Sequence, residues 1–218
     1  PEEKDAYFLR GSAELELGDY ESAKADFDKA ISMDPKNYDR LIEIYEALAA
    51  HGYREVGQEY LQNVLDTAKQ LDAYDSGRIY YYLGEYQKAY LALDEARDKG
   101  GADSYLYLGR AYAATGDYNY ASSVYNNYLS KQGPNAEIYN ELGLCEMAKK
   151  EYQNALAAFQ AGKQIEGNSL MQTLCFNEIV AYEYLEDYQQ AEVLMNAYLQ
   201  NYPDDQTAIR EQQFLSTR

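Results

Sequence analysis

The sequence predicts an all-α fold, a solenoid of repeated αα-hairpins that ends in a C-terminal capping helix. The first observation behind this prediction is the tripeptide Gly-Asp-Tyr at 18–20, which returns at 116–118 and, in close variants, at 84–86, 150–152 and 186–188. The second is a set of small and large apolar residues at fixed distances from each tripeptide. Repeat periods of roughly 20–50 residues are typical of solenoids, because each repeat packs against its neighbours.

Three columns of residues define the register of the repeats. Three positions after the end of the tripeptide, or of its equivalent, stands a small residue: Ala23, Gly57, Ala89, Ala121, Ala155 and Ala191. Four positions later stands a large apolar residue: Phe27, Leu61, Leu93, Tyr125, Phe159 and Met195. Upstream, the small residue is Gly11, Gly77, Gly109 or Gly143, with Tyr45 and Ile179 in its place in the second and sixth repeats. The columns predict six repeats in one solenoid, at about 4–37, 38–71, 72–101, 102–135, 136–167 and 168–203.

The fourth repeat indicates that each repeat is a pair of helices. Tyr105, Leu108 and Tyr112 recur at helical spacing, and a second apolar stripe begins after the tripeptide. Between the stripes, Gly116 is suited to the left-handed conformation that ends a helix. Asp117 is suited to cap the amides that begin the next one. We therefore expect a tight turn between two antiparallel helices.

Two departures from the pattern carry their own expectations. In the second repeat Arg54 replaces the tyrosine and Gly57 replaces the alanine, so its second helix is expected to be shifted or loose. After Pro203, an aspartate at 204 or 205 can cap a last amphipathic helix over about 204–216. We expect this helix to cover the apolar end of the last repeat, as solenoids require.

The pattern resembles the tetratricopeptide repeat family, whose repeat is a helix-turn-helix of about 34 residues. In the first repeat the matching residues are Tyr7, Gly11, Gly18, Tyr20, Ala23, Phe27, Ala30 and Pro35. In the fourth they are Tyr105, Leu108, Gly109, Tyr112, Gly116, Tyr118, Ala121 and Tyr125. The resemblance covers residues 4 to 202. It implies a right-handed superhelix in which the first helix of each pair lines a concave surface.

The composition excludes some classes of partner. There are 37 Asp and Glu against 19 Lys and Arg, which gives a net charge of −18. This charge disfavours nucleic acid or an anionic membrane surface as the main partner. No apolar run approaches the roughly 20 residues of a membrane-spanning helix, so we expect no direct membrane insertion.

No residue set in the sequence points to catalysis, a cofactor or a metal. His51 is the only histidine and lies just before Gly52, where a surface or capping role is expected. Cys145 and Cys175 lie in apolar helical stretches and are expected to be structural thiols. Phosphate loops, calcium loops and zinc ligand sets are all missing from the sequence. We therefore predict a protein that is not an enzyme and uses no cofactor.

The family resemblance implies that five positions of each first helix face a bound peptide. The residues that we take from these positions are Tyr74, Arg78, Tyr81 and Tyr82 in the third repeat, Leu106, Arg110, Ala113 and Ala114 in the fourth, Asn140, Leu144, Met147 and Ala148 in the fifth, and Phe176 and Val180 in the sixth. Residues 70–135 also contain 13 of the 26 tyrosines, which favours a binding centre there. The open alternative is that exposed tyrosine is a compositional habit of the source.

Arg78 and Arg110 occupy the same position in consecutive repeats, so the pattern predicts that they lie side by side. Two guanidinium groups at this place would clamp a ligand carboxylate. Some family members grip a C-terminal carboxylate with a defined set of Lys, Asn and Arg. Here Phe8 and Ser12 stand where Lys and Asn would be expected, so that particular mode is not predicted.

The leading prediction is a non-catalytic scaffold that binds a protein or peptide in a concave groove. One alternative is a regulatory or sensor module of a larger or processed extracytoplasmic protein, and another is a self-associating structural protein that forms homo-oligomers. Because the sequence begins with Pro1 rather than Met, we expect a processed product or a piece of a longer chain, from which any signal peptide, lipid anchor or neighbouring domain has been removed. The compartment, cytoplasmic or extracytoplasmic, stays open.

Overall fold

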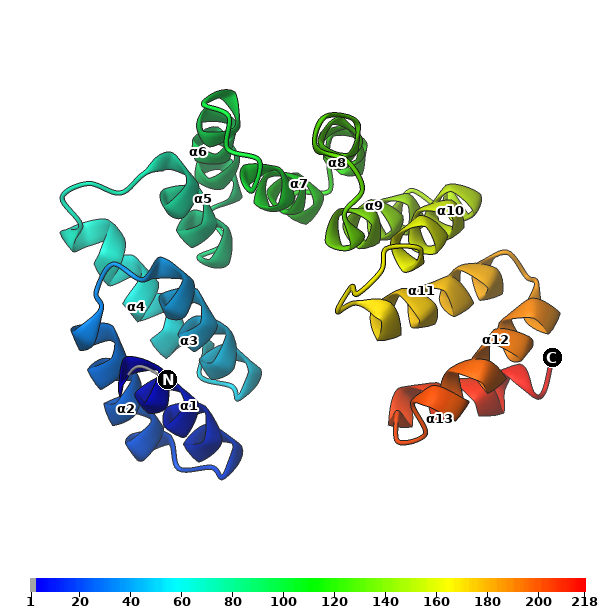
Figure 1. Cartoon of the computed structure of the whole chain (residues 1–218), viewed down its shortest axis with the longest axis horizontal. Coiled ribbons are helices and arrows are strands. Elements are labelled where there is room, and N and C mark those ends of the chain that lie inside the picture. The colour runs from blue at the N-terminus through cyan, green and yellow to red at the C-terminus, as the bar shows by residue number, and fades with distance from the viewer. Residues whose placement is uncertain (1–2) are drawn as a thin grey trace. The chain divides into compact units, whose positions relative to one another are not determined.

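The computed structural model describes residues 3–218, and in this range the chain forms thirteen α-helices and no strand (Figure 1). The prediction of an all-α fold of helical hairpins is therefore confirmed. None of the helices in this range combines the length and the apolar character needed to cross a membrane. The chain divides into two compact units, the first ending at Ala96 and the second starting at Arg97. That all six repeats form one solenoid stays a prediction.

Both units are built from antiparallel helix pairs that follow one another along the chain (Figure 1). The first unit holds α1 Glu3–Glu16, α2 Tyr20–Met33, α3 Tyr38–Ala50, α4 Arg54–Thr67, α5 Ala73–Tyr82 and α6 Tyr86–Asp98, whose last residues belong to the second unit. The second unit holds α7 Ser104–Ala114, α8 Tyr118–Gln132, α9 Ala136–Ala148, α10 Tyr152–Lys163, α11 Met171–Tyr184, α12 Tyr188–Asn201 and α13 Gln206–Leu215.

The recurring tripeptide forms the turn inside every pair except the second. Gly116 has a φ of +84°, and the Asp117 carboxylate accepts a hydrogen bond from the backbone N–H of Tyr120 at 3.1 Å. The helix end and the N-cap predicted from this motif are thus confirmed. Lys150 and Glu186 occupy the glycine position in the fifth and sixth repeats, where they adopt the same left-handed conformation, with φ of 64° and 60°.

A small residue on one helix receives a large residue of its partner. A β-carbon at Gly109 on α7 would lie 2.3 Å from the Tyr125 ring of α8, so only glycine permits this approach. In the second repeat the large residue lies on the first helix and the small residue on the second, since Tyr45 on α3 packs on Gly57 of α4. Helix α4 begins at Arg54, in register with the other second helices, and Gly57 is buried. The expectation of a shifted or loose second helix is therefore wrong, because the exchange preserves the close fit.

Helix α13 covers the apolar end of the second unit, as predicted. The Asp205 carboxylate caps it by accepting a hydrogen bond from the backbone N–H of Ala208 at 3.1 Å. Ala208 and Leu215 are buried in a cluster with Ile179 and Met195. The last pair thus buries its apolar stripe against a helix of its own chain.

Candidate binding site

In the first unit, Arg78 on α5 connects two first helices. Its guanidinium forms ion pairs with Asp39 on α3 and with Asp75, the latter at 2.6 Å, and lies over the Tyr74 ring at 4.4 Å from the centroid. Only 7% of Arg78 is exposed. Burial by itself lowers the pKa of Arg78, but the hydrogen bonds that it donates to Asp39 and Asp75 outweigh this effect and hold the pKa above its ordinary value. Arg78 and Tyr74 therefore form a charge-compensated link between α3 and α5.

Tyr81 and Tyr82, at the end of α5, line an open cleft in the first unit. Their rings are 5.2 Å apart and meet edge to face, and Tyr81 is 5.9 Å from the Tyr86 ring at the start of α6. The ring centroid of Tyr45, on α3, lies 5.2 Å from that of Tyr82. The cleft has a volume of about 360 Å³ and lies among α3, α4, α5 and α6. Four tyrosine side chains thus supply its aromatic lining.

Two charged side chains also line this tyrosine cleft, which we define by Tyr45, Glu46, Arg54, Gln58, Tyr81, Tyr82 and Tyr86. The Tyr82 hydroxyl donates to Glu46 Oε1 at 2.6 Å. Arg54 Nη1 donates to the Tyr45 hydroxyl at 3.1 Å. The cleft therefore combines aromatic rings with one carboxylate and one guanidinium.

Sequence reasoning missed Tyr45, Glu46, Arg54 and Tyr86 as lining residues. Tyr86 is the tyrosine of the tripeptide at 84–86, and its place in that turn motif indicates an architectural role. For Tyr45 and Arg54 a signal was present, because both depart from the repeat pattern in the same repeat. The second repeat, in which Tyr45 replaces glycine and Arg54 replaces the turn tyrosine, is the repeat that forms one side of the cleft.

In the second unit, Arg110 on α7 is paired with two glutamates of α9. Its Nη2 lies 2.7 Å from Glu141 and 3.0 Å from Glu137, and its Nε donates to Glu141 at 2.9 Å. Burial lowers the pKa of Arg110, but the two carboxylates raise it above its ordinary value. Like Arg78, Arg110 thus ties one first helix to another within its own unit.

Of the four predicted α9 residues, Leu144 and Ala148 are exposed, and Asn140 and Met147 are packed. Leu144 is 44% exposed. Asn140 is buried and accepts a hydrogen bond from Asn177 of α11 at 2.9 Å. Met147 packs against the core cluster around Phe159. Leu144 is therefore the large apolar side chain that the predicted α9 positions expose.

The remaining predicted positions serve mainly packing or lie at helix ends. Leu106 and Ala113 pack against the core cluster around Tyr125, and Phe176 packs against the cluster around Met195. Val180 is partly buried, and Ala114 and Ala148 are exposed at the last residues of α7 and α9.

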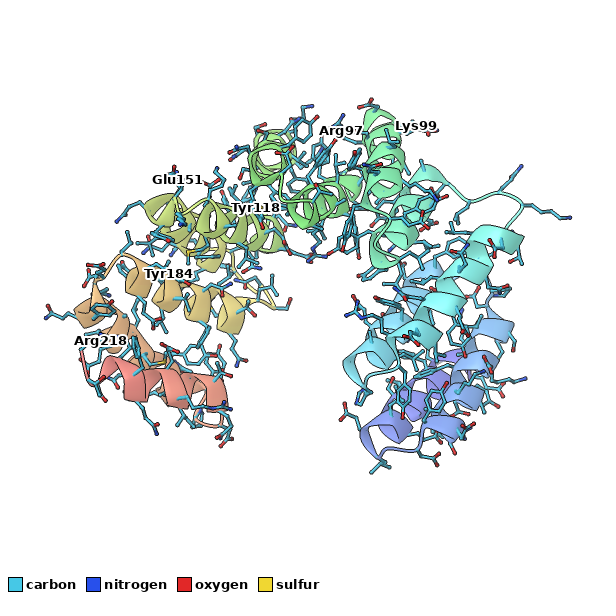
Figure 2. All side chains as sticks on the ribbon, turned by 180° about the vertical axis from the view of Figure 1, so that it is seen from behind. Arg97, Lys99, Tyr118, Glu151, Tyr184 and Arg218 are labelled. Atoms are coloured by element: carbon cyan, nitrogen blue, oxygen red, sulfur yellow. The ribbon has the colours of Figure 1, made fainter. Side chains whose placement is uncertain are left out.

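Tyrosine rings also meet outside the cleft. Tyr184 on α11, labelled in Figure 2, stacks on Tyr152 with ring centroids 5.0 Å apart and is 57% exposed. Its surroundings differ from those of the cleft, since it belongs to a single stacked pair. Replacing Tyr184 is therefore a matched control for replacing a cleft tyrosine such as Tyr81, because both residues are aromatic and lie at the end of a first helix.

The side chains of Cys145 and His51 contact other parts of the chain in ways that indicate structural roles. The Cys145 thiol is buried, and burial raises its pKa to about 12, so it stays protonated. The His51 ring nitrogen Nδ1 lies 2.9 Å from the Ala47 carbonyl oxygen, and Nε2 lies 3.4 Å from Glu16. Across residues 3–218, no three His, Cys, Asp or Glu side chains are grouped so as to hold a metal ion.

Stacked helical hairpins with a covered C-terminal end define an α-solenoid repeat protein. Sequence models of the tetratricopeptide repeat match residues 4–37, 74–121 and 108–168. The chain belongs to the tetratricopeptide repeat family, as the sequence pattern indicated. Members of this family generally act as scaffolds for protein–protein interaction. No curated protein matches the sequence.

Solved structures of tetratricopeptide repeat proteins resemble the chain over most of its length. The type IV pilus biogenesis factor PilW is 18% identical, with 99% of each chain covered and a TM-score of 0.65. A thermophilic TPR protein of Thermus thermophilus is 15% identical, with 99% of this chain and 100% of that chain covered and a TM-score of 0.60. YrrB, described as a TPR protein with an unusual peptide-binding site, is 18% identical, with 86% and 97% covered and a TM-score of 0.57. At these identities the likeness concerns the fold.

Proposed function

We propose that the chain is a non-catalytic scaffold that binds a protein or peptide, with the tyrosine cleft as its main contact in the first unit. The observation that carries this proposal is the open aromatic lining formed by Tyr81 and Tyr82 with Tyr45 and Tyr86. Rigid tyrosine rings supply a large contact area at a low cost in conformational entropy. The peptide-binding site in the name of YrrB is a precedent for this use of the fold.

The second unit adds a contact surface of its own on its first helices. Leu144 on α9 is one of its exposed apolar side chains, and Arg110 lies next to Glu137 and Glu141. A ligand carboxylate at Arg110 or Arg78 would compete with carboxylates that already pair with these guanidiniums. The tyrosines, rather than the two arginines, are therefore the proposed anchors.

A random peptide library displayed on phage tests this proposal with the whole chain as bait. We expect selected peptides whose affinity, measured by titration calorimetry, falls about tenfold in Tyr81→Ala, because truncating a central aromatic anchor removes much of the binding energy. The control variant Tyr184→Ala should bind like the unmodified chain. A library that yields no binding peptide, or peptides that bind Tyr81→Ala unchanged, would count against the proposal.

Self-association is the second candidate, and two exposed leucines favour it. Leu9 and Leu17 of the first unit are 60% and 84% exposed. Apolar residues at this exposure can join copies of a chain if they form part of a larger patch. Light scattering over a range of concentrations tests self-association, since a mass that stays at 24.9 kDa excludes a stable oligomer.

A further inference from the structure

We propose that the tyrosine cleft holds the side-chain cation of a lysine or arginine from a basic segment of the partner. This inference rests on the proposed binding function and adds the chemistry of the bound side chain. It follows from the ring arrangement, the Glu46 carboxylate and the charge of the unit that contains the cleft.

The ring arrangement provides faces and edges around one small volume. Tyr81 lies 5.2 Å from Tyr82 and 5.9 Å from Tyr86, and the rings are steeply inclined to each other rather than stacked. Rings inclined in this way present faces as well as edges toward one another, and a cation within about 6 Å of a ring face is attracted by the ring quadrupole. An open aromatic cleft of this kind suits an ammonium or a guanidinium group.

The first unit already places its own cations on tyrosine rings. The Lys88 ammonium lies 5.3 Å from the Tyr80 centroid, and the Lys24 ammonium lies 5.8 Å from that of Tyr60. These contacts use the same chemistry that we infer for the ligand. The same ring chemistry is available in the cleft to a lysine of another chain.

Glu46 gives the cleft its anionic group. One of its oxygens accepts the Tyr82 hydroxyl hydrogen at 2.6 Å, which fixes the carboxylate beside the rings. A carboxylate has several acceptor positions, so Glu46 can also accept a hydrogen bond from a ligand cation. A neutral apolar ligand would use the rings but not this carboxylate.

The net charge of the unit favours the same occupant. Residues 1–96 hold 21 Asp and Glu against 10 Lys and Arg. Such an excess attracts basic partners over a distance and repels acidic ones. Arg54 is the opposing group in the lining, and its charge lowers the affinity for a cation and raises it for an anion. Arg54 therefore distinguishes the two possible signs of ligand charge.

Tyrosine-ring NMR signals provide the first test. The whole chain, labelled on its tyrosine rings, is titrated with N-acetyl-lysine methylamide, and with the norleucine and aspartate analogues for comparison. Signals of Tyr81 and Tyr86 are assigned by changing each to Phe. We expect a saturable shift of both signals with the lysine compound only. Equal shifts with norleucine, a preference for aspartate, or no saturable shift would overturn the inference.

Charge variants provide the second test. We expect Glu46→Gln to weaken binding of the lysine compound about threefold, and Arg54→Gln to strengthen it by a similar factor. Glu59→Gln, an exposed change on α4 outside the cleft lining, should leave it unchanged. An opposite order of the first two variants would show that the cleft prefers an anion. Thermal melting confirms that each variant is folded.

The two proposals can fail separately. If library peptides bind at Tyr81 but the lysine compound shows no advantage over norleucine, the scaffold function stands and the cation inference fails. If the lysine compound binds and no peptide is selected, the cleft chemistry stands and peptide binding fails.

Discussion

At the scale of single residues, glycine sets the distance between the two helices of a pair. A β-carbon at Gly109 would lie 2.3 Å from the Tyr125 ring, whereas one at Gly57 would lie 2.9 Å from the Tyr45 ring. Contacts this short force a neighbour to move, and the shorter one requires the larger movement. The exchange of sizes in the second repeat also explains the cleft, because it places the tyrosine on the first helix, beside Tyr82.

We predict that Gly109→Ala lowers the free energy of unfolding by about 2 kcal/mol, and that Gly57→Ala lowers it by less. Each change gains the same helix propensity, so the difference between them reports the packing cost alone. Urea denaturation of both variants measures it. Equal effects in the two variants, or a larger effect at Gly57, would contradict the geometric explanation.

At the scale of elements, the turn between α9 and α10 contains backbone strain. Lys150 adopts a φ of 64°, a conformation in which its β-carbon crowds the backbone. The equivalent residue of the fourth repeat is Gly116, with a φ of +84° and no atom near the position that a β-carbon would take. The same turn is therefore formed with strain in one repeat and without it in the other.

We predict that Lys150→Gly raises the free energy of unfolding by roughly 0.5–1 kcal/mol, since glycine adopts this conformation without a steric cost. The reciprocal change, Gly116→Lys, should lower it by about 1 kcal/mol. Thermal or urea denaturation measures both. A destabilised Lys150→Gly chain would mean that the lysine side chain contributes more than the strain costs.

The contact between α11 and the capping helix α13 depends on pH. Burial, together with the nearby Glu211 of α13, raises the pKa of Glu183 from 4.5 to about 7. In the unfolded chain Glu183 ionises near 4.5. The folded state is thus favoured most below that value, and this advantage is lost as pH rises through about 7.

We predict that raising the pH from 5 to 8 removes about 1 kcal/mol of stability through this residue, a value reduced for its partial exposure to water. Glu183→Gln should abolish this part of the pH dependence. Glu192→Gln, an exposed change on α12, should retain it. Melting temperatures of the three proteins at both pH values make the comparison. An identical pH response in Glu183→Gln and the unmodified chain would refute the assignment.

At the scale of the whole molecule, both compact units are acidic. The first contains 21 acidic and 10 basic residues, and the second 16 and 9. Several of the few arginines are used inside the units, where Arg40 pairs with Asp5 at 2.8 Å and Arg110 pairs with Glu141. Each pair neutralises one carboxylate for one guanidinium, so the excess of carboxylates in each unit is unchanged. A basic partner therefore suits the whole chain as well as the cleft.

The repeat pattern was enough to predict the family, the helix pairs, their turns and the capping helix. These features depend on contacts between residues close in sequence, such as the hydrogen bond between Asp117 and Tyr120. Residue type and spacing determine such contacts directly. The same reasoning failed for the second repeat, because the exchange of Tyr45 and Gly57 keeps the fit while breaking the column pattern.

Only the tertiary structure decided how the predicted site residues are used. Arg78 and Asp39 are 39 residues apart, and Tyr82 and Glu46 are 36 apart. Whether such side chains meet depends on how neighbouring helix pairs stack on each other. The repeat pattern contains little information about this stacking, but the stacking determines which partners each side chain can reach. The sequence by itself therefore determined the architecture of this protein. The stacking of the pairs decided that the arginines have partners within their own unit and that the tyrosines line an open cleft.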